Sequence, residues 1–350
     1  MNAKDRMIME EYRESKADFE QLEKKVVEIL QGIASNCNIR IYAINHRVKE
    51  EKSLAGKLER KGDKYSSLSD ITDILGTRVI CFFSDDVDKL AKKIEDNFTV
   101  DWEESIDKRK YLDVNTFGYL SVHYICSLKQ DGDYPPQLKD KRFEVQMCSI
   151  MQHMWAVMEH DLGYKTKFGV PNAVKRDFFR LAGLLEIADE HFVNIRNNVS
   201  AYTKAVHERI ITDNAKELPI DSVSLEEYMN NSESMRSFLQ TVSNVCEAEI
   251  THESPDNYLD QLDWLKKRTI GDLQQMLNDN YSLALQMITK RLATAELDIL
   301  SSTVALRFLC HAELITKRYD KNLIMDFFML TMKNKERAER YTQRLIEEYM

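Results

Sequence analysis

The sequence contains little glycine and proline, with 10 Gly and 5 Pro in 350 residues. Low-complexity chains and many-turned β-sandwiches need more of both, so we expect a folded, helix-rich protein of about two domains. Long apolar runs are also missing, since no stretch approaches the ~18 apolar residues of a membrane-spanning helix. The charged N-terminus lacks the apolar core of a signal peptide. These absences predict a cytoplasmic protein without a membrane partner.

The six cysteines are scattered and form no C-x-x-C pair. Buried thiols in a reducing compartment are therefore favoured over disulfides or a zinc site. Acidic residues outnumber basic ones, 58 to 49, and the net charge of −9 disfavours a general nucleic-acid binder, because the overall field repels polyanions. Positive charge is concentrated locally in residues 39–64, which contain Arg40, Arg47, Lys49, Lys52, Lys57, Arg60, Lys61 and Lys64.

Hydrophobic periodicity predicts an α+β first half of the chain. Residues 4–33 have helical spacing and predict one or two amphipathic helices as an N-terminal flank, residues 1–38. Further along, β-branched and aromatic runs alternate with a helical segment. The expected elements are strands at 71–83, about 98–103, 119–128 and 143–147, and a helix at about 87–97. This order favours a mixed sheet flanked by helices.

The second half of the chain reads as helical almost to its end. Apolar residues between 171 and 209 form a stripe that we expect to pack on the α+β core, which would then span residues 39–211. A polar segment at 212–222 is the expected domain boundary. Residues 222–350 are expected to be an all-α domain, in which Ser224–Glu227 match a capping box. Its Met and aromatic residues favour core packing, with a self-association surface or a regulatory partner as the open alternative.

Three motifs in the first half contain side chains suited to phosphate chemistry. Arg47, Lys49, Ser53 and Lys57 are spaced by two, four and four residues, which predicts a basic helix whose face can hold a polyphosphate. A solvated surface helix would show the same spacing.

The second motif is acidic. Asp73 precedes an expected buried strand, while Glu144 and Gln146 alternate onto one face of another strand. Acids at buried strands are unusual unless they are paired, capped or bound to a metal, and Mg²⁺ prefers such oxygen ligands. For Asp73, a helix cap or a salt bridge is the alternative.

The third motif is Gly118-Tyr119-Leu120-Ser121-Val122-His123. Strand alternation places Tyr119, Ser121 and His123 on one face, where an aromatic ring and two hydrogen-bonding groups can stack on a base and bind its sugar or phosphate. An ordinary amphipathic strand is the alternative.

Together, these segments resemble the RelA/SpoT synthetase domain, a nucleotidyltransferase-like family that transfers pyrophosphate from ATP to the 3′-hydroxyl of GDP or GTP. The resemblance covers about residues 39–167, including Asp73 and Arg78, the E-x-Q strand at Glu144, and a following helix with Trp155 and His160. It implies synthesis of the alarmone (p)ppGpp with Mg²⁺ as cofactor. The implied roles are ATP binding for Arg47, Lys49, Ser53, Lys57 and Arg78; catalysis and metal binding for Asp73 and Glu144; and acceptor binding for Tyr119, Ser121, His123 and Gln146.

Some positions depart from the family's pattern. Leu120, Cys148 and Ser149 stand where many members have arginine or an Arg-Thr pair, and Asn115 replaces a basic residue. These departures leave two alternatives open. One is a toxic relative that modifies the 3′ ends of tRNA or adenine nucleotides, and the other is a non-catalytic nucleotide-sensing module.

Overall fold

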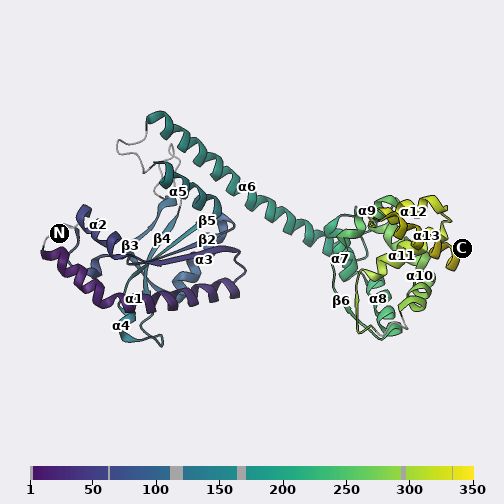
Figure 1. Cartoon of the computed structure of the whole chain (residues 1–350), viewed down its shortest axis with the longest axis horizontal. Helices are drawn as coiled ribbons and strands as arrows, with labels where there is room; N and C mark the ends of the chain where they lie inside the picture. The colour runs from purple at the N-terminus through teal and green to yellow at the C-terminus, as the bar shows by residue number, and fades with distance from the viewer. Residues whose placement is uncertain (1–2, 62–63, 111–120, 164–170, 293–296, 333) are drawn as a thin grey trace. The chain divides into compact units, whose positions relative to one another are not determined.

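The computed structural model describes residues 3–61, 64–110, 121–163, 171–292, 297–332 and 334–350. The chain divides into two compact units, Met1–Arg196 and Asn197–Met350 (Figure 1). The boundary between the two units falls within the sequence of helix α6 (Asn172–Ile211), whereas residues 212–221 connect α6 to α7 (Ser222–Asn231). Among the described residues, no helix is long and apolar enough to cross a membrane.

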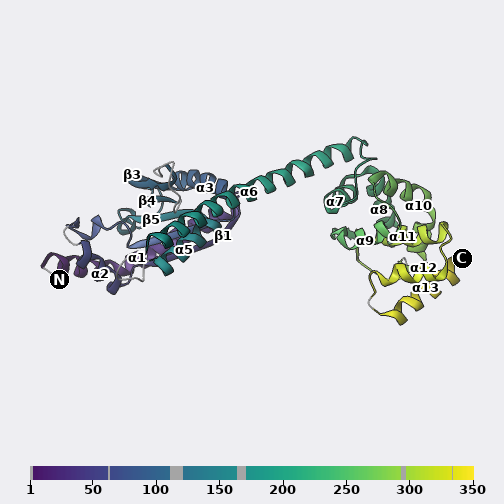
Figure 2. The same cartoon turned by 90° about the horizontal axis from the view of Figure 1, so that it is seen from above.

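The N-terminal unit is built on a five-stranded sheet with the order β1-β2-β5-β4-β3. Strands β2 and β5 are parallel and the other neighbours are antiparallel, so the sheet is mixed, as expected. Figure 2 shows β3, β4 and β5 following one another across the sheet, with β1 beyond them. The strands are β1 (Ile41–Val48), β2 (Leu75–Cys81), β3 (Phe98–Asp107), β4 (Val122–Leu128) and β5 (Phe143–Ser149). Its helices before α6 are α1 (Ala3–Asn36), α2 (Glu51–Lys61), α3 (Ser84–Asn97), α4 (Pro136–Lys139) and α5 (Ile150–Gly163). Short 3-10 turns are η2 (Leu68–Asp70) and η3 (Lys108–Lys110).

Helices α1 and α3 cover one face of this sheet. Alternate residues of the strands, such as Val79 and Val145, join the apolar side of α1 and α3 in one hydrophobic cluster. The intervening residues, including Arg78 and Gln146, therefore lie on the opposite face. Helix α5 lies on that opposite side of the sheet (Figure 1). The sheet thus separates a hydrophobic core from a polar face.

The segment around Arg47 differs from the expected basic helix. Residues 41–48 form edge strand β1, with Arg47 paired to Gly76 of β2, and Lys49 lies in the connection to α2. Only Ser53 and Lys57 lie together on a helix. The helical interpretation was wrong because the alternation of Ile41, Ala43 and their neighbours is satisfied by pairing with β2, a partner distant in sequence.

The C-terminal unit contains α7, α8 (Glu233–Cys246), α9 (Leu259–Trp264), α10 (Ile270–Leu292), α11 (Val304–Thr316), α12 (Lys321–Met329) and α13 (Lys335–Tyr349). They enclose their own hydrophobic cluster. A two-stranded parallel sheet of β6 (Glu249–Thr251) and β7 (Ile299–Ser301) and the turn η4 (Pro255–Tyr258) add to the expected all-helical region. The capping box at α7 begins one turn earlier than expected, because Asp221 is the N-cap and accepts a hydrogen bond from the Ser224 backbone.

The cysteines are buried as expected. The apolar stripe of α6 was expected to pack on the core, and much of it is exposed. Five of the six free thiols are buried, and Cys37 is half-buried. On α6, several large apolar side chains are exposed, among them Leu184 and Ile195. The stripe therefore does not pack as a whole on the core, because only one side of α6 contacts its own unit.

Candidate active site

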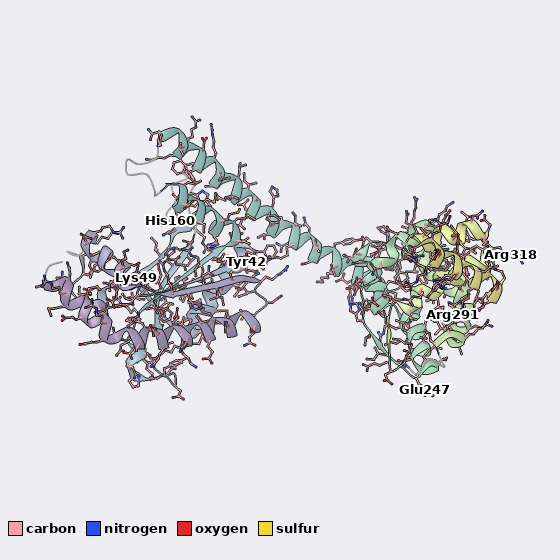
Figure 3. All side chains as sticks on the ribbon, viewed as in Figure 1. Tyr42, Lys49, His160, Glu247, Arg291 and Arg318 are labelled. Carbon is pink, nitrogen blue, oxygen red and sulfur yellow. The ribbon has the colours of Figure 1, made fainter. Side chains whose placement is uncertain are left out.

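A cavity of about 360 Å³ lies on the polar face of the sheet. Its lining comes from β1, the loops before α2 and β2, the strands β2 and β5, and helix α5. The lining residues are Asn45, His46, Arg47, Lys49, Asp73, Gly76, Thr77, Arg78, Glu144, Gln146 and His160. Lys49 and His160 are labelled in Figure 3, where Lys49 lies at the sheet and His160 extends from α5. Sequence segments far apart therefore meet at one cavity.

Asp73 joins the basic motif to the sheet. Lys49 donates to its Oδ2 at 2.8 Å and Lys57 donates to its Oδ1 at 2.6 Å. Burial would raise the pKa of the Asp73 carboxyl, but the hydrogen bonds and charges of both lysines outweigh burial and hold that pKa below its usual range. The Lys49 backbone is itself anchored, because its carbonyl accepts from the Tyr12 hydroxyl of α1. The result is an ionised carboxylate between two ammonium groups.

Glu144 is the second carboxylate of the cavity. His123 Nδ1 lies 2.8 Å from Glu144 Oε1, and Gln146 Nε2 donates to Oε2 at 2.9 Å. Burial would raise the pKa of Glu144, but these contacts, led by that with His123, hold the pKa below its usual value. Glu144 is therefore ionised at neutral pH. The expected sharing of one strand face by Glu144 and Gln146 is confirmed.

Gln146 and His153 hold the guanidinium of Arg78. Gln146 Oε1 accepts from Arg78 Nε at 3.0 Å and from Nη2 at 2.8 Å. Arg78 Nη1 lies 3.4 Å from His153 Nδ1 of α5. Burial and the charge of Arg78 lower the pKa of His153, which keeps the ring neutral and able to accept a hydrogen bond. Arg78 is thus fixed in direction at the cavity wall.

The remaining predicted site residues do not all lie at the cavity. Arg47 is exposed on β1 and lines the cavity, whereas Ser53 is exposed on α2 and does not line it. Ser121 is completely buried, and its hydroxyl lies 2.6 Å from His123 Nε2. Tyr119 lies outside the described residues, as do Asn115 and Leu120. The structure therefore brings together both carboxylates and most of the cationic side chains.

The donor set of the cavity is compatible with a hard divalent cation. Asp73 and Glu144 present carboxylate oxygens, and both are ionised at neutral pH because their pKa values are lowered. Mg²⁺ is typically bound by one or two carboxylates together with substrate phosphates. Within the described ranges, no group of three or more His, Cys, Asp or Glu residues forms a complete protein-only metal site. Phosphate oxygens would have to complete the coordination.

Sequence reasoning missed Asn45, His46, Thr77 and His153. Asn45 lies two residues before Arg47, so recognising β1 as a strand would have placed both on one face of the sheet. Alternation alone would have placed His46 on the other face, where its ring contacts Glu23 of α1. His153 carries no local signal, because its contact with Arg78 depends on how α5 packs against β2.

Comparisons with known proteins relate the segment that contains most of this cavity to one protein family. Residues 46–168 match the family model described as the region found in RelA / SpoT proteins. Two curated GTP pyrophosphokinases of Bacillus subtilis (strain 168) are similar. YjbM is 29% identical over 163 residues, covering 45% of this chain and 72% of YjbM. YwaC is 28% identical over 159 residues, covering 44% of this chain and 72% of YwaC.

A solved structure of small alarmone synthetase 1 from Bacillus subtilis, bound to its product pppGpp, is 23% identical, with a TM-score of 0.45. That likeness covers 55% of this chain and 99% of the synthetase chain. The family match and the curated relatives support a RelA/SpoT-type synthetase domain at residues 46–168.

Proposed function

We propose that the N-terminal unit is an ATP-dependent pyrophosphokinase that transfers the β,γ-pyrophosphate of ATP to the 3′-hydroxyl of GDP or GTP. One observation carries the proposal: two ionised carboxylates and three cationic side chains line a single cavity of about 360 Å³ in the segment that matches the family. Opposite charges placed in this way suit a reaction in which positioning and charge neutralisation supply most of the catalysis.

Binding of ATP is assigned to Arg47, Lys49, Ser53, Lys57 and Arg78. Lys49 and Lys57 now pair with Asp73. We expect both ammonium groups to move to phosphate oxygens of ATP when it binds, since a polyphosphate offers them more negative charge than one carboxylate. Arg78 is held by Gln146 and presents a planar group to adenine or phosphate.

Asp73 would then be released to hold Mg²⁺ together with Glu144. Bound Mg²⁺ would neutralise charge on the phosphate oxygens. The exchange would give a role to both lysines that pair with Asp73, of which Lys49 lines the cavity together with Asp73 and Glu144.

Glu144 is assigned as the base that activates the acceptor. It removes the proton of the 3′-hydroxyl as that oxygen bonds to the β-phosphorus of ATP. The bond from this phosphorus to the oxygen bridging to the α-phosphate breaks, and AMP leaves. His123 and Gln146 orient the Glu144 carboxylate through both of its oxygens. Tyr119 is assigned to stacking on the acceptor base.

The test uses γ-labelled ATP and Mg²⁺ with GDP, GTP, AMP or bulk tRNA in separate reactions. The wild-type protein is expected to place label in guanine nucleotide, and Glu144→Gln is expected to lose about 10²–10⁴-fold in rate, the range typical of a general base. Glu103→Gln, on the exposed part of strand β3, is the matched control and should keep wild-type activity.

Other outcomes contradict the proposal in defined ways. Label in tRNA or adenine nucleotide alone would indicate the toxic relative, and ATP binding without transfer to any acceptor would indicate a nucleotide-sensing module. Wild-type activity in Glu144→Gln would overturn the assignment of the base.

A further inference from the structure

Ser121, His123 and Glu144 form a continuous chain of hydrogen bonds beside the cavity. The Ser121 hydroxyl lies 2.6 Å from His123 Nε2, and His123 Nδ1 lies 2.8 Å from Glu144 Oε1. The pairing of β4 with β5 brings the histidine to the glutamate. Hydroxyl, imidazole and carboxylate in this order are also the parts of a hydrolase triad, in which the serine is the nucleophile. The same three groups can instead act in the opposite direction, with the carboxylate at the reactive end.

Exposure decides between these two directions. A nucleophilic serine has to reach its substrate, whereas Ser121 is 0% exposed. Glu144 stands at the other end of the chain of hydrogen bonds, and of these three described residues only Glu144 is among those that line the cavity. The reactive end is therefore the carboxylate, and Ser121 is the buried end.

The direction of each hydrogen bond follows from the charge of Glu144. An ionised carboxylate can only accept, so His123 donates from Nδ1. A neutral His123 ring then has no hydrogen on Nε2 and accepts from the Ser121 hydroxyl, whereas a protonated ring donates from Nε2 to the same oxygen. Because a hydroxyl can donate or accept, Ser121 satisfies Nε2 in both forms, and the ring is held at both nitrogens.

The Ser121 hydroxyl is itself held in place by the backbone. The Ser121 carbonyl accepts from the Lys108 backbone N–H at 3.0 Å, which ties the residue before β4 to the residue after β3. Val122, the next residue, is buried in the hydrophobic cluster, so strand alternation directs Ser121 and His123 to the polar face. The hydroxyl and the ring therefore meet within three residues of one anchored backbone segment.

We propose that Ser121 is a positioning residue for Glu144: its hydroxyl fixes the plane of the His123 ring, and the ring presents its Nδ1–H to the carboxylate. Ser121 was expected to bind the acceptor, but its hydroxyl is fully buried and engaged with His123. Without this hydroxyl, Nε2 loses its partner and the ring can rotate, so that Glu144 loses an aligned donor. The inference rests on the proposed function, in which Glu144 is the base.

A double-mutant cycle tests whether Ser121 acts through His123. Ser121→Ala, His123→Ala and the double variant are assayed with labelled ATP and GTP, and circular dichroism verifies that each is folded. We expect Ser121→Ala to lower kcat by about 10–100-fold, the range found for the outer hydrogen-bonding partners of metal-bound side chains, and to leave the KM for GTP unchanged. In the His123→Ala background, the same change should alter kcat by no more than about twofold.

The matched control is Ser127→Ala. Ser127 is a half-buried serine on the same strand, β4, and lies away from His123. This variant should keep the wild-type kcat.

A second measurement needs no turnover. The His123 Nδ1 proton is bonded to a carboxylate, and the His123 side chain is only 12% exposed, so we expect a downfield proton NMR resonance that His123→Ala removes. Ser121→Ala should also remove this resonance, because a ring that rotates exchanges the proton with water. His46 and His207 contact carboxylates through Nδ1 elsewhere, and Ser121→Ala should leave their resonances unchanged.

The outcomes separate this proposal from the proposed function. A raised KM for GTP with an unchanged kcat in Ser121→Ala would assign Ser121 to the acceptor and overturn the proposal. Equal losses of kcat from Ser121→Ala with and without His123 would overturn it as well. If the wild-type protein transfers no label to guanine nucleotide, the proposed function fails, and the NMR resonance still decides the role of Ser121: its persistence in Ser121→Ala would show that the hydroxyl does not hold the ring.

Discussion

At the scale of single residues, Gln146 links the two halves of the candidate site. One end of its amide accepts from Arg78, and the other end donates to Glu144. Gln146 was expected to bind the acceptor, but both ends of its side chain are already engaged within the protein. We therefore expect Gln146 to position Arg78 and Glu144 relative to each other.

Gln146→Glu tests this positioning role. The new carboxylate would still accept from Arg78 but would face Glu144 with a like charge, which raises the pKa of the pair. Because transfer requires ionised Glu144, we expect the acidic limb of the pH–rate profile to move to higher pH, with a lower rate at neutral pH. The profile of Gln137→Glu, an exposed position on α4, should match the wild type. If the acidic limb of the Gln146→Glu profile is unchanged, Gln146 does not position Glu144 for the reaction.

Part of this residue-scale geometry follows from the sequence. Strand alternation predicted that Glu144 and Gln146 share a face, and that Ser121 and His123 do so, and both hydrogen-bonded pairs are present. The bond between His123 and Glu144 did not follow from either strand alone, because it depends on β4 pairing with β5.

At the scale of elements, α6 contacts the sheet through a buried carboxyl. Asp189 is buried on α6 and accepts from the Ser149 hydroxyl at the end of β5. Burial raises the pKa of Asp189 to about 6, against an ordinary value of 3.8. The folded protein thus binds this proton more tightly than the unfolded chain does.

This raised pKa predicts how stability depends on pH. The contribution of the Asp189 proton is fully present below pH 3.8 and is lost as pH rises through about 6, so at neutral pH the ionised carboxyl destabilises the fold. Asp189→Asn keeps an oxygen that accepts from Ser149 and carries no charge. We expect it to raise the free energy of unfolding at pH 7 by about 1–3 kcal/mol, with little change at pH 4.

Urea denaturation of both proteins at the two pH values checks the Asp189→Asn prediction. A variant less stable than the wild type at pH 7 would show that the Asp189 charge is compensated by its surroundings.

The elements themselves were predicted unevenly. The strands after residue 71 and the helix before β3 were confirmed, because their apolar runs are local signals. β1 was mistaken for part of a helix, because its charged residues obscure a short alternation that only pairing with β2 stabilises.

At the scale of the whole molecule, the two units have separate hydrophobic clusters. Phe238 is fully buried in the C-terminal cluster, and Phe143 is fully buried in the N-terminal cluster. Units with separate cores need not unfold as a single cooperative transition. We expect two calorimetric transitions, each belonging to one cluster.

Phe238→Ala and Phe143→Ala test this independence. Each substitution leaves a cavity that lowers the free energy of unfolding of its unit by about 3–5 kcal/mol. We expect it to lower the transition temperature of that unit alone. Both variants are measured by scanning calorimetry, and each serves as the matched control for the other. A single transition that shifts equally in both variants would show that the two units unfold together.

The sequence by itself determined the α+β class of the first half, the helical second half, and the motifs that characterise a RelA/SpoT-type domain. These properties depend on spacing along the chain, which hydrophobic periodicity and motif order record directly. Only the tertiary structure decided that Lys57 meets Asp73, that His153 contacts Arg78, and that large apolar side chains of α6 such as Leu184 are exposed. The reason is physical: such contacts join residues distant in sequence, and strand pairing and helix packing alone bring them together.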